Sequence, residues 1–145
     1  MHKICRPLGL IWSDLCREKL FRIGIAIKIL LIVALIPTIQ QEWFVPFIVN
    51  WIENPTKLPW SGYLMSDGDR LAFPYGVVMF ISLLPTTAFG WILDHFFAVE
   101  FFTSIGFKIS LFGADILLLL LLLQVFENHW KKVLIYYWLS PLVLF

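Results

Sequence analysis

Residues 107–126 read FKISLFGADILLLLLLLQVF, and this stretch decides the fold. Its length matches the roughly 20 mostly apolar residues that a helix needs to cross a bilayer. The rest of the chain has the same character, because 60% of its 145 residues are hydrophobic and only 14% are charged. A soluble domain of this size needs more polar surface to cover its core. The sequence therefore predicts an all-α integral membrane protein.

Further apolar segments on either side of this stretch predict three to four transmembrane helices in a single membrane domain, residues 1–145. Segments 21–39 and 73–93 are the other two spans, and 133–145 begins a fourth apolar run. That last run is too short to cross a bilayer, and no polar residue follows Phe145. We therefore expect the chain to be the N-terminal part of a longer protein; the alternative is a complete small protein with a half-inserted tail.

The charges before the first span predict its orientation. Residues 1–22 carry five Lys and Arg side chains against Asp14 and Glu18, which places the N-terminus in the cytoplasm. Apolar residues between Leu8 and Leu15 recur at helical spacing and predict a short interfacial helix. Lys28, within two turns of the start of the span, is expected to snorkel to the headgroups. No small-x-small cleavage site follows, so we predict an uncleaved anchor in a multi-pass protein of the bacterial inner membrane or the endoplasmic reticulum.

Two lysines near the end of the chain leave the later topology open. Three simple crossings place Lys131 and Lys132 outside, against the positive-inside tendency. A broken hairpin around Pro85, within residues 73–103, removes the conflict.

Residues 40–72 differ in kind from the spans and predict a large non-cytoplasmic first loop. They are rich in proline and tryptophan, so they cannot form one helix. Their Trp and Tyr rings favour the membrane interface. We expect short interfacial helices here, including an amphipathic one over residues 43–53.

Other classes of site find little support. No basic run with interleaved aromatic residues indicates nucleic acid as a partner. Cys5 and Cys16 precede the first span and are expected to be free thiols facing the cytoplasm. The three histidines lie far apart in the sequence and form no metal-binding motif.

The order of several short motifs resembles the start of the GT-C class of polytopic membrane glycosyltransferases, over roughly residues 20–145. It is most similar to the branch that includes the first mannosyltransferase of glycosylphosphatidylinositol anchor synthesis. The chain departs from the family pattern at Gln40 and Gln41, which leave Glu42 alone, and at Ser140, where Asn is usual. The motifs that carry the resemblance are Glu42-Trp43-Phe44-Val45, Asn54-Pro55 to Pro59-Trp60, Phe73-Pro74-Tyr75-Gly76, Lys108 with Ala114-Asp115-Ile116-Leu117-Leu118, and Tyr137-Trp138-Leu139-Ser140-Pro141.

The resemblance implies transfer of a hexose such as mannose from a polyprenyl-phosphate or dolichyl-phosphate carrier to an acceptor on the non-cytoplasmic face. Its partners would be the lipid bilayer, the lipid-linked donor and possible partner membrane subunits. Such enzymes are several times longer, so 145 residues alone are not expected to be active. The alternative is a non-catalytic small subunit or scaffold that binds partner helices, and a third hypothesis is transport along a polar path.

Glu42 is the first candidate catalytic residue. Inverting glycosyl transfer needs a carboxylate to take the acceptor proton, and the family places that acid in the first outer loop. The competing interpretation is an ordinary interfacial acid.

Asp67 and Asp69 flank Gly68 and are the other catalytic candidates. Two carboxylates spaced by one residue can bind Mg²⁺ or Mn²⁺ through oxygen, a weak metal prediction. The same tripeptide is also favourable turn chemistry. Arg70 beside it would pair with a lipid phosphate or balance the two acids.

Asp115 lies inside the most apolar span, so it needs a polar partner within the bundle. Lys108, two turns earlier, can reach it only through water or another helix. Helix packing and a chemical role both remain open for this pair.

The aromatic residues of the outer loop have two interpretations. Trp60, Tyr63 and Tyr75 would bind the donor by stacking on its sugar or holding its prenyl chain, or they form an interfacial belt.

Overall fold

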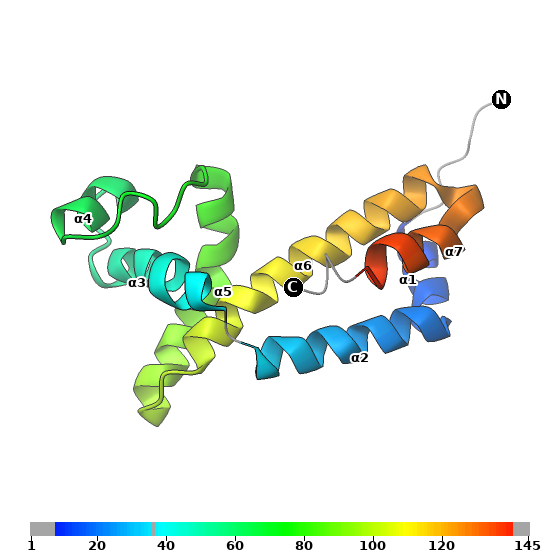
Figure 1. The fold of residues 1–145 in the computed structure, drawn as a ribbon, viewed down its shortest axis with the longest axis horizontal. Coiled ribbons are helices and arrows are strands. Elements are labelled where there is room, and N and C mark those ends of the chain that lie inside the picture. Colours follow the sequence, from blue (N-terminus) through cyan, green and yellow to red (C-terminus); the bar gives the residue numbers. More distant parts are fainter. Residues whose placement is uncertain (1–7, 36, 141–145) are drawn as a thin grey trace. The chain divides into compact units, whose positions relative to one another are not determined.

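The computed structural model describes residues 8–35 and 37–140, with only the backbone for residues 8–11. These residues form helices and turns, and no strand occurs among them (Figure 1). Short π-helical turns lie at Gln40–Phe44 (η1) and Leu134–Trp138 (η3), and a 3₁₀ turn at Glu127–His129 (η2). The α-helices are α1 (Leu8–Arg17), α2 (Lys19–Ala34), α3 (Val45–Glu53), α4 (Pro59–Met65), α5 (Val77–Phe97), α6 (Phe102–Val125) and α7 (Trp130–Val133).

The chain divides into two compact units. Unit 1 combines Met1–Ala34 with Gly113–Phe145, and unit 2 is the continuous segment Leu35–Phe112. Unit 2 is thus inserted into the sequence of unit 1, and α6 contributes its first half to one unit and its second half to the other.

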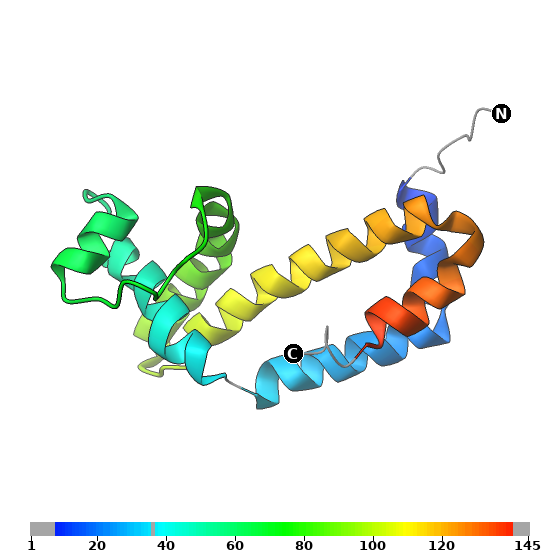
Figure 2. The same cartoon turned by 45° about the horizontal axis from the view of Figure 1, so that its top comes forward.

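Unit 1 is held together where the C-terminal segment lies against α2. The Trp138 ring stacks on Phe21 with 5.2 Å between centroids, and Trp12 meets the other edge of Phe21 at 5.9 Å. Gly24 makes this contact possible, because a Cβ there would lie 2.1 Å from Trp138 Nε1. In Figures 1 and 2 the α7–η3 segment runs beside α2, and the end of α6 lies at the same end of the unit as the start of α2.

Unit 2 is built on aromatic packing between α5 and residues 40–72, the segment predicted as a non-cytoplasmic loop and called the outer loop below. Phe47 of α3 stacks on Phe73 at 4.7 Å and meets Phe80 of α5 edge-on at 5.9 Å. Proline at the first or second position of both α3 and α4 suits a helix start, where the missing N–H has no partner to lose. The loop is therefore a folded layer on α5.

Small residues bring α5 and the first half of α6 together as an antiparallel hairpin. A Cβ on Gly90 would lie 2.2 Å from the Phe102 carbonyl oxygen, and one on Gly106 would lie 2.1 Å from that of Thr86. The Thr86 and Ser110 hydroxyls are 2.5 Å apart, and the Ser110 hydroxyl donates to the Ser82 carbonyl at 2.9 Å. Small and hydroxyl side chains at close helix contacts are typical of helix pairs in membranes.

Two helices in the described part of the chain, α5 and α6, are long and apolar enough to cross a membrane. They overlap the predicted spans 73–93 and 107–126, with boundaries shifted by up to five residues. The predicted span 21–39 is shorter, because α2 ends at Ala34, close to Pro37, and the residue before a proline disfavours helix. Its 16 residues reach about 24 Å at the usual helical rise.

Other local predictions fare unequally. The predicted helices near residue 8 and before Glu53 are present as α1 and α3, and their place at a membrane interface stays a prediction. The break at Pro85 is wrong, because α5 continues through this proline and the chain turns instead at residues 98–101. The fourth apolar run is α7 and η3 as far as Trp138, and residues 141–145 lie outside the described residues.

Candidate functional site

The first candidate site is the outer loop of unit 2, and an aromatic cluster fixes its shape. The indole N–H of Trp60 donates to the Phe73 carbonyl at 3.2 Å, which ties α4 to the chain that leads into α5. Trp60 and Tyr63 both pack on Phe47, at 5.6 and 5.3 Å between ring centroids. The cluster consists of the buried Phe47, Ile48, Phe73, Phe80, Leu83 and Phe107 with half-buried residues around them, among which are Phe44, Trp51, Trp60 and Tyr63.

This packing decides which aromatic faces are available to a ligand. Trp60 and Tyr63 are half-buried and use their rings within the cluster. Tyr75 is 41% exposed and touches Phe44 with one edge at 5.5 Å. Of the three predicted donor-binding aromatics, Tyr75 therefore has the most open ring.

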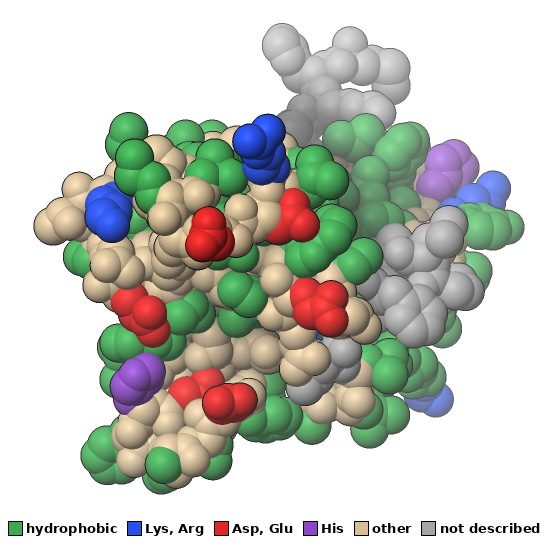
Figure 3. Space-filling view, turned by 60° about the vertical axis from the view of Figure 1, so that its left-hand side comes forward, with side chains coloured by type: hydrophobic (Ala, Val, Ile, Leu, Met, Phe, Trp, Pro, Cys, Tyr) green, Lys and Arg blue, Asp and Glu red, His purple; other side chains and the backbone are tan. Residues whose placement is uncertain are grey.

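The predicted acids of the outer loop lie on its surface. Glu42 is exposed in η1, one turn before α3 begins. Asp67, Asp69 and Arg70 are also exposed, in the turn that follows α4. Figure 3 shows acidic side chains spread over this side of the molecule. Unit 2 carries six Asp and Glu against three Lys and Arg, so its formal net charge is −3.

The Asp67–Asp69 segment is a turn held by its own hydrogen bonds. Asp67 has a left-handed backbone, with φ of 59°, and the Gly68 N–H donates to the Tyr63 carbonyl at 3.0 Å. The Asp69 carboxylate accepts the Leu71 N–H at 2.8 Å. Turn chemistry therefore accounts for the tripeptide, and both carboxylates still face outward.

A metal site finds limited support here. Within the described residues, no group of three or more His, Cys, Asp or Glu side chains is arranged to hold a metal ion. Asp67 and Asp69 make an incomplete ligand set, and one Asp69 oxygen is already engaged by Leu71.

Burial raises the pKa of the Tyr63 hydroxyl, and the charge of Asp69 adds to the effect, so this phenol stays neutral at physiological pH.

The second candidate site is a polar network in unit 1, in which Lys28 and Trp138 are buried and Asp115 and Tyr137 are half-buried. The Lys28 ammonium lies 2.8 Å from the Asp115 carboxylate, and the Tyr137 hydroxyl donates to the other oxygen of that carboxylate at 2.5 Å. Lys28 also sits 4.7 Å from the centre of the Trp138 ring, whose N–H donates to the Phe21 carbonyl at 3.1 Å. Both charges and both aromatic side chains thus have partners.

This network corrects the prediction for Lys28 and supplies the polar partner that Asp115 was expected to need. Lys28 does not snorkel, because it is buried, with 4% of its surface exposed, and paired with an acid. Asp115 has its partner on α2 and on the C-terminal segment, whereas Lys108 donates to the Leu35 carbonyl in unit 2. The structure therefore does not join Asp115 to Lys108 as one polar pair.

Asp94 is a structural residue that no local sequence pattern predicts. This buried carboxylate, near the end of α5, accepts three backbone N–H groups and one hydroxyl at the start of α6. An Asp before a helix is a known capping signal, but here seven or more residues separate it from its partners. That separation hides the cap from local pattern reading.

The comparisons with known proteins add no family: no family model, curated protein or solved structure matches this chain.

Proposed function

We propose that the protein is inserted in a membrane through three to four helical segments, with α5 and α6 as the two longest. Large apolar side chains on these helices are exposed, as contact with lipid requires; examples are Val78, Ile81 and Phe89 on α5 and Leu117, Leu121 and Val125 on α6. α2 is a further inserted segment in this proposal, since its Lys28 is neutralised by Asp115 and its Ile23, Leu30 and Val33 are exposed.

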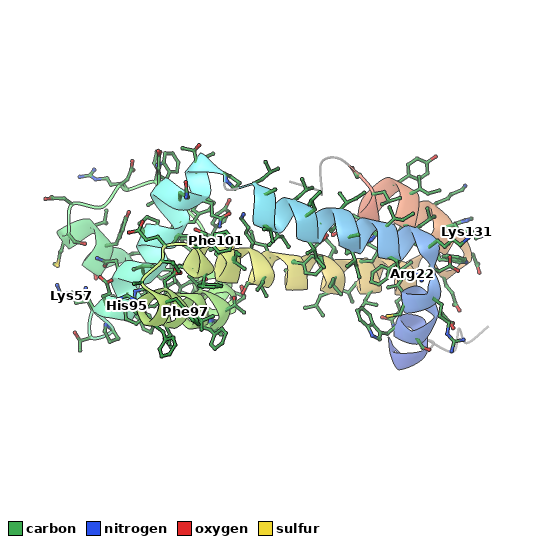
Figure 4. The ribbon with its side chains drawn as sticks, turned by 90° about the horizontal axis from the view of Figure 1, so that it is seen from below. Arg22, Lys57, His95, Phe97, Phe101 and Lys131 are labelled. Atoms are coloured by element: carbon green, nitrogen blue, oxygen red, sulfur yellow. The ribbon has the colours of Figure 1, made fainter. Side chains whose placement is uncertain are left out.

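The basic end of unit 1 would face the cytoplasm. Figure 4 labels Arg22 and Lys131 at one end of this unit, where α2 begins and α6 has just ended. Lys19 and Lys132 belong to the same two segments and are exposed. Their gathering at one end supports the positive-inside orientation that the N-terminal charges predict. In that orientation α6 runs toward the cytoplasm, so α5 enters the membrane from the side of the outer loop and turns back at residues 98–101 without crossing.

We propose that the protein takes part in hexosyl transfer from a lipid-phosphate carrier, as part of a GT-C-like glycosyltransferase. The observation that carries this proposal is the folded outer loop. Two short helices and an aromatic cluster hold it against α5, and Glu42, Asp67, Asp69 and Arg70 remain exposed on it. A rigid layer at the membrane surface that displays acids and one guanidinium suits a phosphorylated lipid donor and a hydroxyl acceptor.

In this proposal each exposed group has a distinct role. Glu42 takes the proton from the acceptor hydroxyl as the sugar is transferred, and Arg70 pairs with the phosphate of the carrier. Asp67 and Asp69 orient the donor; a divalent cation there would arrive with the donor phosphate, since Mg²⁺ is commonly held by one or two carboxylates and substrate phosphates.

The proposal is tested by measuring transfer of labelled mannose from polyprenyl-phosphate mannose in membranes that contain the protein. Glu42→Gln should lower the rate by about 10²–10⁴-fold, the usual contribution of a general base. Glu53→Gln is the matched control, because Glu53 is an exposed acid at the end of α3 in the same loop. Full activity in Glu42→Gln, Asp67→Asn and Asp69→Asn would remove the site assignment.

The alternative, a non-catalytic subunit that binds partner helices, gives a different result in the same membranes. It predicts tight co-purification with a larger complex and no transfer that depends on any of the three acids. A transport path through Asp115 gains no support, because Lys28 and Tyr137 already occupy its carboxylate.

A further inference from the structure

The corner between α5 and α6 carries three exposed phenylalanine side chains close together in the sequence. Phe96 is 79% exposed, Phe97 58% and Phe101 37%, with the 42% exposed Val99 between them. Figure 4 labels Phe97 and Phe101 at this corner together with His95. The corner thus contrasts with the aromatic cluster of the outer loop, where Phe47 and Phe73 are almost fully buried.

The exposed rings form one continuous apolar surface. Phe96 contacts Phe97 at 5.0 Å, Phe97 contacts Phe102 at 5.9 Å, and Phe102 contacts Phe101 at 5.8 Å between centroids. Contiguous apolar patches on proteins mark surfaces that bind something other than water. Four adjoining phenylalanines at a turn are such a patch.

Five backbone N–H groups of the corner, those of Ala98, Val99, Phe101, Phe102 and Thr103, find their acceptors on Asp94 and need no water. One Asp94 carboxylate oxygen accepts the N–H groups of Phe101 and Phe102 at 3.0 and 2.7 Å. The other accepts the N–H and the hydroxyl of Thr103 at 2.8 and 2.5 Å. On the other side of the turn, the backbone N–H groups of Ala98 and Val99 donate to the Asp94 carbonyl.

This hydrogen bonding matters because apolar lipid offers no substitute partner to an exposed backbone group. An unpaired N–H in the hydrocarbon region costs several kcal/mol, so turns are tolerated at depth only when their donors are satisfied. Asp94 is itself buried, with 8% of its surface exposed, and its charge is shared among four donors. The corner therefore meets the main requirement for leaving water.

We propose that the α5–α6 corner lies within the bilayer interface, with Phe96, Phe97 and Phe101 inserted among the lipid acyl chains. His95 and Glu100 are exposed beside these rings. Their polar side chains stay in contact with the lipid headgroups, and this limits how deeply the corner is inserted. The hairpin is thus anchored at its turn by lipid. This inference rests on the membrane insertion in the proposed function and is independent of any sugar transfer.

The depth of the corner is measured by spin labels on single cysteines in a Cys5→Ser, Cys16→Ser background. The protein is reconstituted in phosphatidylcholine vesicles with a minority of phosphatidylglycerol. Phe97→Cys reports the corner, Ile81→Cys on the exposed face of α5 is the lipid control, and Lys57→Cys in the outer loop is the water control. Collision with oxygen reports lipid, and collision with a water-soluble nickel chelate reports water.

The expected result is a Phe97 label with high oxygen collision and with nickel collision several-fold below that of the Lys57 label. Nickel collision equal to that of Lys57 overturns the inference and leaves membrane insertion intact if the Ile81 label still reports lipid. Low collision with both reagents shows that protein, such as a second copy, covers the corner, and this also overturns the inference. Nickel access at Ile81 overturns membrane insertion itself.

A second variant links the depth to the cap. Asp94→Asn keeps the shape of the side chain but replaces one acceptor oxygen by a donor nitrogen. It should raise nickel collision at the Phe97 label, whereas Glu100→Gln, an exposed acid in the same corner, should leave it unchanged. Equal nickel collision in Asp94→Asn and the unsubstituted protein overturns the role given to Asp94.

Discussion

The two units of this protein place charge in opposite ways. In unit 1, Lys28 and Asp115 are withdrawn from the surface and joined at 2.8 Å, with Tyr137 and Trp138 completing their contacts. In unit 2, Glu42, Asp67 and Asp69 remain on the surface of a loop whose aromatic residues form the core. A buried, satisfied pair fixes the positions of segments, whereas exposed carboxylates stay available to a ligand. The comparison thus favours a structural role for the first group and leaves the second group accessible for the chemistry proposed above.

The largest effect that tests this contrast is expected from Asp115→Leu. It leaves the Lys28 charge buried without its counter-ion, which costs about 3–5 kcal/mol of unfolding free energy. The double variant Lys28→Met, Asp115→Leu should recover much of this loss, because an apolar pair of similar volume is often neutral. Unfolding in mixed detergent micelles measures both. A double variant as unstable as the single one would contradict a mainly structural pair.

Tyr137→Phe should have a smaller effect in the same assay. It removes one hydrogen bond to a charged carboxylate, worth about 1.5–3 kcal/mol, and leaves the ion pair in place. The neighbouring Tyr136 is 77% exposed, so Tyr136→Phe is the matched control and should change little. Equal effects of the two substitutions on the unfolding free energy would show that the hydrogen bond from Tyr137 to Asp115 does not stabilise the protein.

Gly90→Ala and Gly106→Ala are next and probe unit 2. Each new methyl group would meet a backbone carbonyl of the facing helix, and overpacking of this kind costs about 1–3 kcal/mol. Gly113 in α6 has nothing within 4 Å of its Cβ position, so Gly113→Ala should be neutral or stabilise by up to about 1 kcal/mol. Thermal unfolding of the three variants ranks them. Similar stability in all three would argue against the close hairpin.

The smallest expected effect is at Asp67, where one substitution distinguishes a role in forming the turn from a role in binding the donor. Its left-handed backbone is one that glycine adopts without strain, so Asp67→Gly should change unfolding free energy by no more than about 1 kcal/mol. If the carboxylate orients a donor, the same variant loses sugar transfer while keeping its stability. If Asp67→Gly retains sugar transfer, the only role left for Asp67 is to form the turn.

Some structural features of this protein can be predicted from its sequence and others cannot. The difference is the separation along the sequence of the residues that make each contact. The helical fold, the short helix before Glu53 and the turn at Gly68 follow from local patterns of hydrophobicity and from turn-forming residues. Lys28 was expected at the headgroups, because a lone lysine near the start of a span gives no sign of an acid far along the chain.

The same limit applies to the candidate site. Residue type and position in the sequence predict the acids of the outer loop as site residues; the structure shows that they are exposed, and their chemical role stays a prediction. The sequence does not predict that Trp60 and Tyr63 are used in packing, because composition alone does not distinguish a ring that packs from a ring that binds. Asp94 acts on backbone groups across a turn, and backbone groups have no signature in sequence.

The Lys28–Asp115 pair has a consequence for how the protein is made. The two residues are 115 − 28 = 87 positions apart, and all of unit 2 is synthesised between them. At usual translation rates of about 5–20 residues per second, Asp115 is synthesised roughly 4–17 s after Lys28. Unit 2 is continuous and can fold during this interval, so unit 1 closes last. A chain cut short before residue 115 therefore carries Lys28 in its first hydrophobic helix without Asp115, the carboxylate that pairs with it in the folded protein.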